Sequence, residues 1–195
     1  MKPYTIGHLE PSEVDSLLDL QKENLKANLD SETVESQGYV SFRYDPIIIE
    51  RMRADEPQII ARTHEGIVGY VLTATIGAMR TIEAAIPMLD MIETLQFKGK
   101  PCSEQNYYII GQVCVKADFR GQGMFEALYE GHRQNFADSY DFCVTEIAVD
   151  NRRSLAAHHR IGFETIHVFF DAFNGKEWHV VAWDFNFKNK KDTPQ

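Results

Sequence analysis

Residues 113–125 read VCVKADFRGQGMF, the pattern of a strand, a loop with two glycines and the start of a helix. The apolar run 107–115 is long enough for a buried strand. After the glycines, large side chains recur at helical spacing, at Met124, Phe125, Leu128, Tyr129, His132 and Phe136. The first N–H groups of a helix have no partner within it, its dipole is positive there, and glycines let a phosphate approach. This stretch therefore predicts a loop that binds a pyrophosphate.

The size and charge of the chain exclude some classes of function. A length of 195 residues is most simply one domain with an inserted segment. The net charge of -9 at pH 7 argues against nucleic acid as a partner, since its binders usually carry a basic face. An acidic surface favours a cationic substrate, although net charge also serves solubility.

The cysteines and the apolar runs indicate where the chain works. Cys102, Cys114 and Cys143 are scattered and form no C-x-x-C pair, which suits a reducing compartment, and we expect a cytoplasmic protein. The first residues have no apolar core typical of a signal peptide, and no apolar run approaches the ~20 residues that span a bilayer. The seven histidines show no metal-ligand spacing, so we expect neither a membrane nor a metal as a partner.

The remaining pattern predicts a mixed sheet with helices on both faces, an α/β (α+β mixed) class of fold. Ser12 has the position of a helix N-cap, Gly162 that of a C-cap, and Asn174-Gly175 that of a hairpin turn. Segment 77–106 shows a helical period broken by Pro87, and we interpret it as an insertion or lid. Strands are expected at 2–9, 59–63, 67–74, 107–115, 141–149, 163–171 and 177–187. Further helices are expected at 12–28 and 151–161, and a polar tail at 188–195. Segment 30–56 carries helix-start signals without a clear period.

Two motifs resemble those of the GNAT superfamily of acyl-CoA N-acyltransferases. Arg120-Gly121-Gln122-Gly123-Met124 is similar to that family's R/Q-x-x-G-x-G/A loop. Asn151, Ser154, His158, Gly162 and Phe163 have the spacing of its Asn-x-x-Ala/Ser-x-x-x-Tyr-x-x-x-Gly-Phe helix. The resemblance implies one GNAT-like domain over residues 1–187 with six or seven strands. It also implies a sheet splayed between the fourth and fifth strands, with acetyl-CoA as cosubstrate in the gap.

The resemblance also assigns roles to individual positions. The loop amides would hold the pyrophosphate, the backbone of the preceding strand would pair with the pantetheine arm, and the start of the second motif would bind that arm. Gly111 suits a bulge or close approach beside such a ligand. The implied cofactor-binding residues are Val113, Cys114, Val115, Arg120, Gly121, Gln122, Gly123, Met124, Phe125, Asn151 and Ser154.

The sequence departs from the family pattern at two positions that matter. Phe125 stands where glycine or alanine is usual, which the fold accommodates if its ring points into the core. His158 stands where the family has the tyrosine that protonates the departing thiolate, so the resemblance implies His158 as the catalytic acid. A histidine titrates near pH 6.5 and suits proton transfer, although the same residue could be packing on the sheet.

The implied chemistry is direct attack of a neutral amine on the thioester carbonyl. Backbone N–H groups of Val113 to Val115 could stabilise the oxyanion. Glu146 and Gln112 lie near the expected gap, but a glutamine cannot be a base and Glu146 could face solvent, so no base is assigned. Cys114 has no Cys-His-Asn/Asp spacing beside it and is more simply a small buried apolar residue.

These inferences favour an N-acetyltransferase that moves an acetyl group to a primary amine of a small molecule or peptide. The alternatives are a non-catalytic CoA-binding regulatory module of GNAT-like fold and a nucleotide-phosphate-binding domain unrelated to CoA. The resemblance also admits a homodimer. We expect the acceptor to lie between region 25–55 and the final hairpin, lined by Tyr39, Phe42, Tyr44, Phe170, Asp171 and Trp178.

Overall fold

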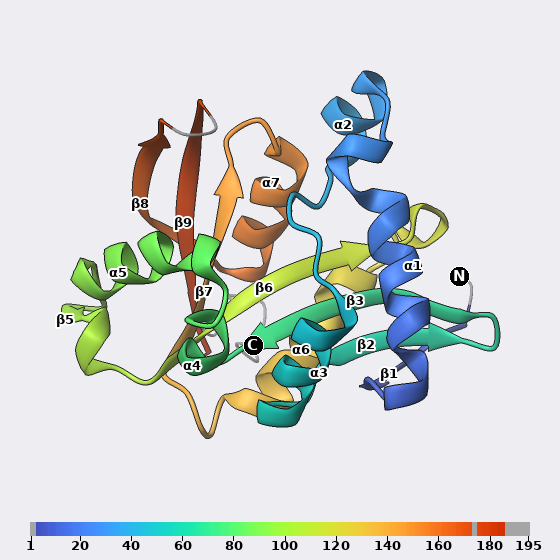
Figure 1. Cartoon of the computed structure of the whole chain (residues 1–195), viewed down its shortest axis with the longest axis horizontal. Coiled ribbons are helices and arrows are strands. Elements are labelled where there is room, and N and C mark those ends of the chain that lie inside the picture. The colour runs from blue at the N-terminus through green and yellow to red at the C-terminus, as the bar shows by residue number, and fades with distance from the viewer. Residues whose placement is uncertain (1–2, 173–174, 186–195) are drawn as a thin grey trace, which may run out of the picture.

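A seven-stranded mixed sheet organises the chain (Figure 1). The computed structural model describes residues 3–172 and 175–185. The sheet order is β1-β2-β3-β6-β7-β9-β8. Its strands are β1 Thr5–His8, β2 Ile59–Thr63, β3 Gly66–Ala74, β6 Tyr107–Val115, β7 Phe142–Ala148, β8 Glu164–Asp171 and β9 Lys176–Asp184. The expected mixed sheet and its strand number are confirmed.

Helices cover both faces of the sheet, as expected. Adjacent strand residues point to opposite faces, so Tyr107 belongs to one core and Tyr108 to the other. The first core lies under α1 Val14–Asn24, α3 Pro46–Asp55, α4 Ile76–Met79 and α5 Ile86–Thr94, and the second lies under α6 Met124–Phe136 and α7 Arg152–Ile161. Helix α2, Ser31–Gln37, is followed by residues 38–45, the crossing segment, which passes over the gap between β6 and β7. None of the described helices combines the length and apolarity that crossing a bilayer requires.

The fourth and fifth strands of the sheet, β6 and β7, separate after a short parallel ladder. Only Tyr107–Ile109 pairs with Phe142–Val144, and in Figure 1 the two strands then run in different directions. The Thr145 hydroxyl donates to the Ile110 carbonyl at 2.9 Å, which satisfies a backbone acceptor where the ladder ends. The expected splay is confirmed, and it leaves one edge of β6 without a strand partner beyond Ile110.

A β-bulge at Gly111 bends β6 next to this gap. Leu72 pairs with Gln112 and Thr73 with Ile110, so Gly111 is the extra residue. The Tyr44 hydroxyl donates to the Gly111 carbonyl at 3.2 Å. The bulge expected at this glycine is confirmed. A Cβ at Gly111 would lie 2.8 Å from that hydroxyl oxygen, so the close contact here is with the Tyr44 side chain.

The segment between β3 and β6 forms a small layer against the first core. It contains α4, α5 and a hairpin of β4 (Gln96–Phe97) and β5 (Lys100–Pro101). Pro87 lies in the first turn of α5, where a proline needs no N–H partner, so it begins this helix and does not interrupt it.

The first helix begins later than the sequence predicts. Ser12 lies inside a 3-10 turn, Pro11–Glu13, where the side chains of Glu10 and Glu13 form a capping box. Helix α1 begins at Val14 and ends at Asn24, because Leu25 is extended. Gly162 ends α7 with a φ of 116°, as expected of a C-cap glycine. Asn174 of the expected turn and the tail 188–195 lie outside the described residues.

Replacing Gly111 by alanine should destabilise the fold by about 1–3 kcal/mol, because the added methyl meets the Tyr44 hydroxyl and, at 3.1 Å, the Met52 methyl. Urea denaturation measures the effect. Gly77→Ala is the control, since an added Cβ on that exposed helical residue meets nothing closer than 3.8 Å. Adding Tyr44→Phe should recover part of the loss, and an unchanged midpoint for Gly111→Ala would contradict the close approach.

Candidate functional site

The two loop glycines adopt conformations that other residues avoid. Gly121 has a φ of 69° and Gly123 a φ of 84°, and Gly123 is the N-cap of α6. A Cβ at either glycine would meet no atom within 4 Å, so the glycines serve the backbone conformation and leave open space before the helix. The first N–H groups of α6 therefore face a cavity, as an anion site requires.

The Arg120 side chain holds the loop from inside. Its Nε donates to the Val115 carbonyl at 2.9 Å and its Nη2 donates to the Asn24 Oδ1 at 2.5 Å. Asn24 is itself buried and donates to the Leu20 carbonyl at 2.9 Å. The motif arginine thus ties the loop to the end of β6 and to α1.

The free edge of β6 presents backbone groups to the gap. The Lys116 N–H donates to the Val68 carbonyl of β3 at 2.8 Å, so the Val115 carbonyl in the same peptide unit points away from β3. Backbone groups alternate between the two edges of a strand, so Val113 and Val115 face the gap and Cys114 faces β3. Val113 and Val115 are the residues whose backbone can pair with an extended ligand.

A cavity of about 590 Å³ begins at this loop. The loop glycines and the end of β6 line one side, and the α7 face with Arg153, Ala157 and Arg160 lines the other. The residues of that face recur at helical spacing and place two cationic side chains on the cavity. Arg160 was not predicted from the sequence, although its position two turns after Arg153 is the signal that identifies it.

Asn151 fastens the crossing segment over the gap. Its Nδ2 donates to the Tyr39 carbonyl at 2.9 Å, while its Oδ1 is buried without a hydrogen-bond partner. Next to Asn151, the Asp150 carboxylate accepts from the Tyr39 hydroxyl and from Lys26 Nζ at 2.8 Å. The side-chain oxygen of Asn151 therefore remains available to a ligand.

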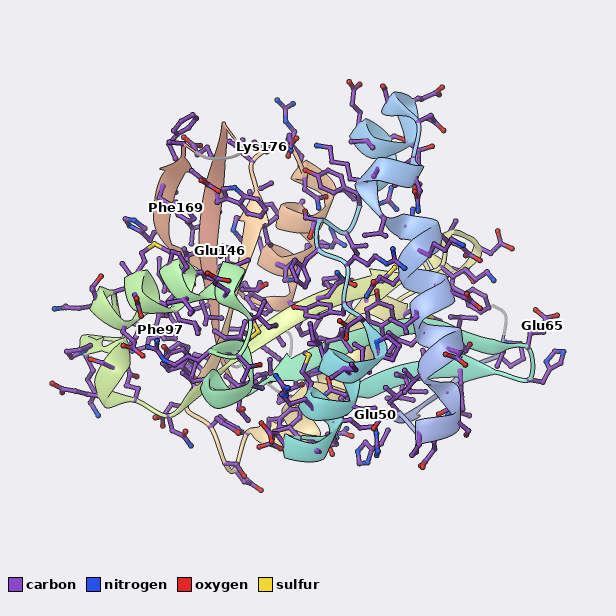
Figure 2. All side chains as sticks on the ribbon, in the orientation of Figure 1. Glu50, Glu65, Phe97, Glu146, Phe169 and Lys176 are labelled. Atoms are coloured by element: carbon purple, nitrogen blue, oxygen red, sulfur yellow. The ribbon has the colours of Figure 1, made fainter. Side chains whose placement is uncertain are left out.

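A second cavity, of about 350 Å³, adjoins the first across the gap. Four residues line both cavities: Tyr39, Val40, Val113 and Ser154. The second cavity lies on the face of the sheet that carries Glu146 and Phe169, and Figure 2 shows these two side chains above α5. The two cavities therefore adjoin at the gap between β6 and β7.

His158 lies in the wall of the second cavity and is 1% exposed. Its Nδ1 lies 2.8 Å from the Ser154 carbonyl oxygen and its Nε2 lies 2.7 Å from the Tyr129 hydroxyl. A carbonyl only accepts, so Nδ1 carries the proton and Tyr129 donates to Nε2. Burial lowers the pKa of His158 to about 4, so the imidazole is neutral at pH 7.

Glu146 is the unpaired carboxylate of the second cavity. Its Oε1 is buried without a hydrogen-bond partner. Burial, helped by the charge of Asp171, raises the pKa of Glu146 to about 7. A carboxyl group that changes charge near neutrality can accept a proton from a ligand.

No protein-family model matches the chain, and no curated protein matches it either. Solved structures do match. The ribosomal-protein-S18-alanine N-acetyltransferase from Escherichia coli is similar with a TM-score of 0.62 at 10% identity, over 98% of this chain and 99% of that chain. A GNAT-family protein from Desulfovibrio desulfuricans reaches 0.61 at 10% identity, over 94% and 99%. Arabidopsis thaliana NAA60 in complex with acetyl-CoA reaches 0.58 at 12% identity, over 93% and 99%.

The chain has the GNAT fold. At these identities the likeness concerns the fold, and the site must be argued from this chain's own residues. Within the GNAT fold, the glycine loop and the gap between β6 and β7 lie where the sequence motifs placed them.

The residues predicted to bind the cofactor occupy different places in the GNAT fold. Phe125 packs edge-on against His158 with ring centroids 5.1 Å apart, so its ring points into the core as required. Gln122 donates to the Asp118 carbonyl at 2.7 Å and does not line the first cavity, whereas Met124 is buried and Ser154 borders both cavities. Their roles toward a cofactor remain predictions.

Cys114 does not have the environment of a nucleophile. Its side chain is buried, and burial raises the pKa of the thiol to about 12. At neutral pH it is a protonated thiol in the core, as the simpler interpretation of the sequence has it.

The expected aromatic wall lies in the second cavity, with one difference. Tyr39, Phe42, Tyr44, Asp171 and Trp178 all line it. Phe170 does not: it is 66% exposed, and Phe169 takes its place. The register of β8 shifts between Thr165 and His167, and period 2 then turns Phe169 toward the cavity, which the sequence could not show.

Replacing Glu146 by glutamine should stabilise the fold at pH 8 by about 1–3 kcal/mol and change it little at pH 4. The raised pKa means that the folded state holds the proton more tightly, so the native chain loses stability as pH rises from 4.5 to 7. Urea denaturation at both pH values measures the difference. Glu177→Gln, on an exposed side chain of β9, is the control, and equal effects of the two changes at pH 8 would contradict the burial of Glu146.

Proposed function

We propose that this chain is an acetyl-CoA-dependent N-acetyltransferase that transfers an acetyl group to a primary amine by direct attack. The observation that carries the proposal is the gap between β6 and β7, which joins the phosphate-loop cavity to a cavity that contains an unpaired carboxylate. The acetyltransferases among the structures of similar fold, some with acetyl-CoA, support it.

The residues on both sides of the gap fit acetyl-CoA, which when bound supplies an acetyl group activated as a thioester. The N–H groups at the start of α6 would hold the pyrophosphate, with Arg153 and Arg160 adding positive charge. The backbone of Val113 and Val115 would pair with the pantetheine amides, and the unpartnered Asn151 Oδ1 would accept from one of them. A Val113 N–H facing the gap would also stabilise an oxyanion.

Glu146 is the residue we propose as the general base. Amines are mostly ammonium ions at neutral pH, so the acceptor must lose a proton before it attacks. A carboxylate with a pKa near 7 is matched to that task, and its buried oxygen has no competing partner.

His158 is the residue we propose as the proton donor to the departing thiolate. It borders the second cavity, where the motif alignment places the donor. In the present geometry Nδ1 carries the proton and Nε2 accepts from Tyr129. The donor role therefore requires an exchange of tautomer or of hydrogen-bond partner during turnover.

The thiols support a proposal about where the protein works in the cell. Cys102, Cys114 and Cys143 are free and buried, which suits a reducing compartment, so we propose a cytoplasmic enzyme. The homodimer stays a prediction.

Glu146→Gln should lower kcat by about 10²-fold or more, because a positioned base contributes 10² to 10⁴-fold. The native rate should rise with pH through about 7, as Glu146 loses its proton, and this step should vanish in the variant. Its residual rate should follow the neutral fraction of the amine in solution. Acetyl transfer to an amine panel between pH 5 and 10 measures both, with Glu177→Gln as the control. Tight CoA binding without turnover on any amine would favour the non-catalytic module.

His158→Phe should slow the chemical step at least tenfold while acetyl-CoA binding, measured by thermal shift, stays intact. Tyr129→Phe is the matched control, because it removes only the hydrogen bond to Nε2 and leaves the imidazole in place. A loss of less than a few-fold in His158→Phe would show that the thiolate leaves unaided and that His158 is a packing residue.

A further inference from the structure

The second cavity, where we expect the acceptor and which we call the acceptor cavity, has mainly apolar walls, and its charged side chains are carboxylates. Besides apolar residues of β6 and β7, its apolar surface comes from three parts of the chain that are distant in sequence: the crossing segment with Phe42, the inserted segment with Met79 and Met88, and the last hairpin with Phe169 and Trp178. Glu146 and Asp171 are its carboxylates, and among the described residues no lysine or arginine lines it.

Three of the neutral polar side chains of this cavity are already engaged within the protein. Gln112 accepts from the Tyr70 hydroxyl at 2.5 Å and donates to the Phe42 carbonyl at 2.7 Å. The Tyr44 and Thr145 hydroxyls donate to carbonyls of β6. These side-chain donors are therefore spent inside the protein, and the buried atoms without a partner here, Glu146 Oε1 and Asn151 Oδ1, are acceptors.

A cavity with hydrogen-bond acceptors, negative charge and apolar walls favours a cationic ligand over an anionic one. An ammonium group between the carboxylates is favoured, and the aromatic faces of Phe169 and Trp178 add cation–π attraction. A carboxylate on the ligand would be buried with no lysine or arginine of the described residues beside it, next to Asp171 and a Glu146 that is partly ionised near pH 7, which is unfavourable.

We infer that the acceptor is a small primary amine with an apolar body and no carboxylate, and that Asp171 selects it by its charge. The inference rests on the proposed acetyltransferase function and specifies its substrate class. A cavity of about 350 Å³ suits a body the size of one aromatic ring or a short alkyl chain. Met88, from the inserted segment, limits that size.

The test compares acceptors that differ by one group. We expect kcat/KM for 2-phenylethylamine to exceed that for phenylalanine at least 100-fold, and phenylalaninamide, which lacks the carboxylate charge, to recover most of the difference. A tetrapeptide with a free N-terminus should be a poor acceptor. Preference for phenylalanine or for the tetrapeptide would overturn the inference while leaving the acetyltransferase function intact.

Two variants test the residues themselves. Asp171→Asn should raise KM for 2-phenylethylamine about tenfold, and it should also lower the pH at which the rate rises, because the charge of Asp171 helps to raise the pKa of Glu146. Asp138→Asn, on the α6–β7 connection outside the cavity, should change neither. Met88→Ala should shift the preference toward bulkier amines. An unchanged KM in a folded Asp171→Asn variant would overturn the role of Asp171.

A binding measurement separates this inference from the proposed reaction. Thermal shift by 2-phenylethylamine and by phenylalanine, with CoA present, reports on the cavity without turnover. A shift by the amine alone, without acetylation of any amine, would support the cavity's selectivity and contradict the enzyme function. Equal shifts by both compounds would overturn the selectivity.

Discussion

The separation of β6 from β7 after three residue pairs is the constraint on which the rest of the structure depends. A strand edge inside a protein carries N–H and C=O groups that must find partners. The Thr145 side chain binds the carbonyl of Ile110, which follows the last pair. Tyr44 binds the carbonyl of the bulged Gly111, and Arg120 binds the carbonyl of Val115. These side chains satisfy carbonyl groups that would otherwise bind a neighbouring strand. The remaining backbone groups of β6 line the gap.

The crossing segment between α2 and α3 closes the gap from above. Asn151 holds its backbone and Asp150 holds its Tyr39 side chain, with Lys26 4.3 Å from the centre of the Tyr39 ring. The start of α7 thus fastens a segment more than a hundred residues earlier in the chain. Because Tyr39 borders both cavities, the same contacts hold the wall that the two cavities share.

The two cavities have opposite electrostatic character. Each holds charged groups that stability alone would not favour. The first has a helix N-terminus, three arginines and one glutamate, Glu126, which pairs with Arg160; the net positive charge suits an anionic cosubstrate. The second has a buried carboxylate whose raised pKa reflects the free energy of keeping it from water. Such a group weakens the fold when charged, and a catalytic role gives a physical reason for its presence.

Local pattern was enough for the elements next to the motifs. The apolar run of β6, the glycines before α6, the glycine after α7 and the bulge at Gly111 each follow from rules that act within a few residues. The class of fold could be predicted for the same reason, because alternating strands and helices admit few topologies. Ser12 and Phe170 mark the limit, since a capping box formed by other residues and a register shift in β8 decided those positions.

The sequence by itself determined the glycine loop, the second motif and the succession of strands and helices along the chain, because these depend on local spacing and backbone conformation. Only the tertiary structure decided that Glu146 is buried without a partner, that His158 is held between Ser154 and Tyr129, and that the inserted segment lines the second cavity. The physical reason is that burial and hydrogen-bond partners come from residues far apart in the chain. Spacing along a single sequence carries no record of those contacts.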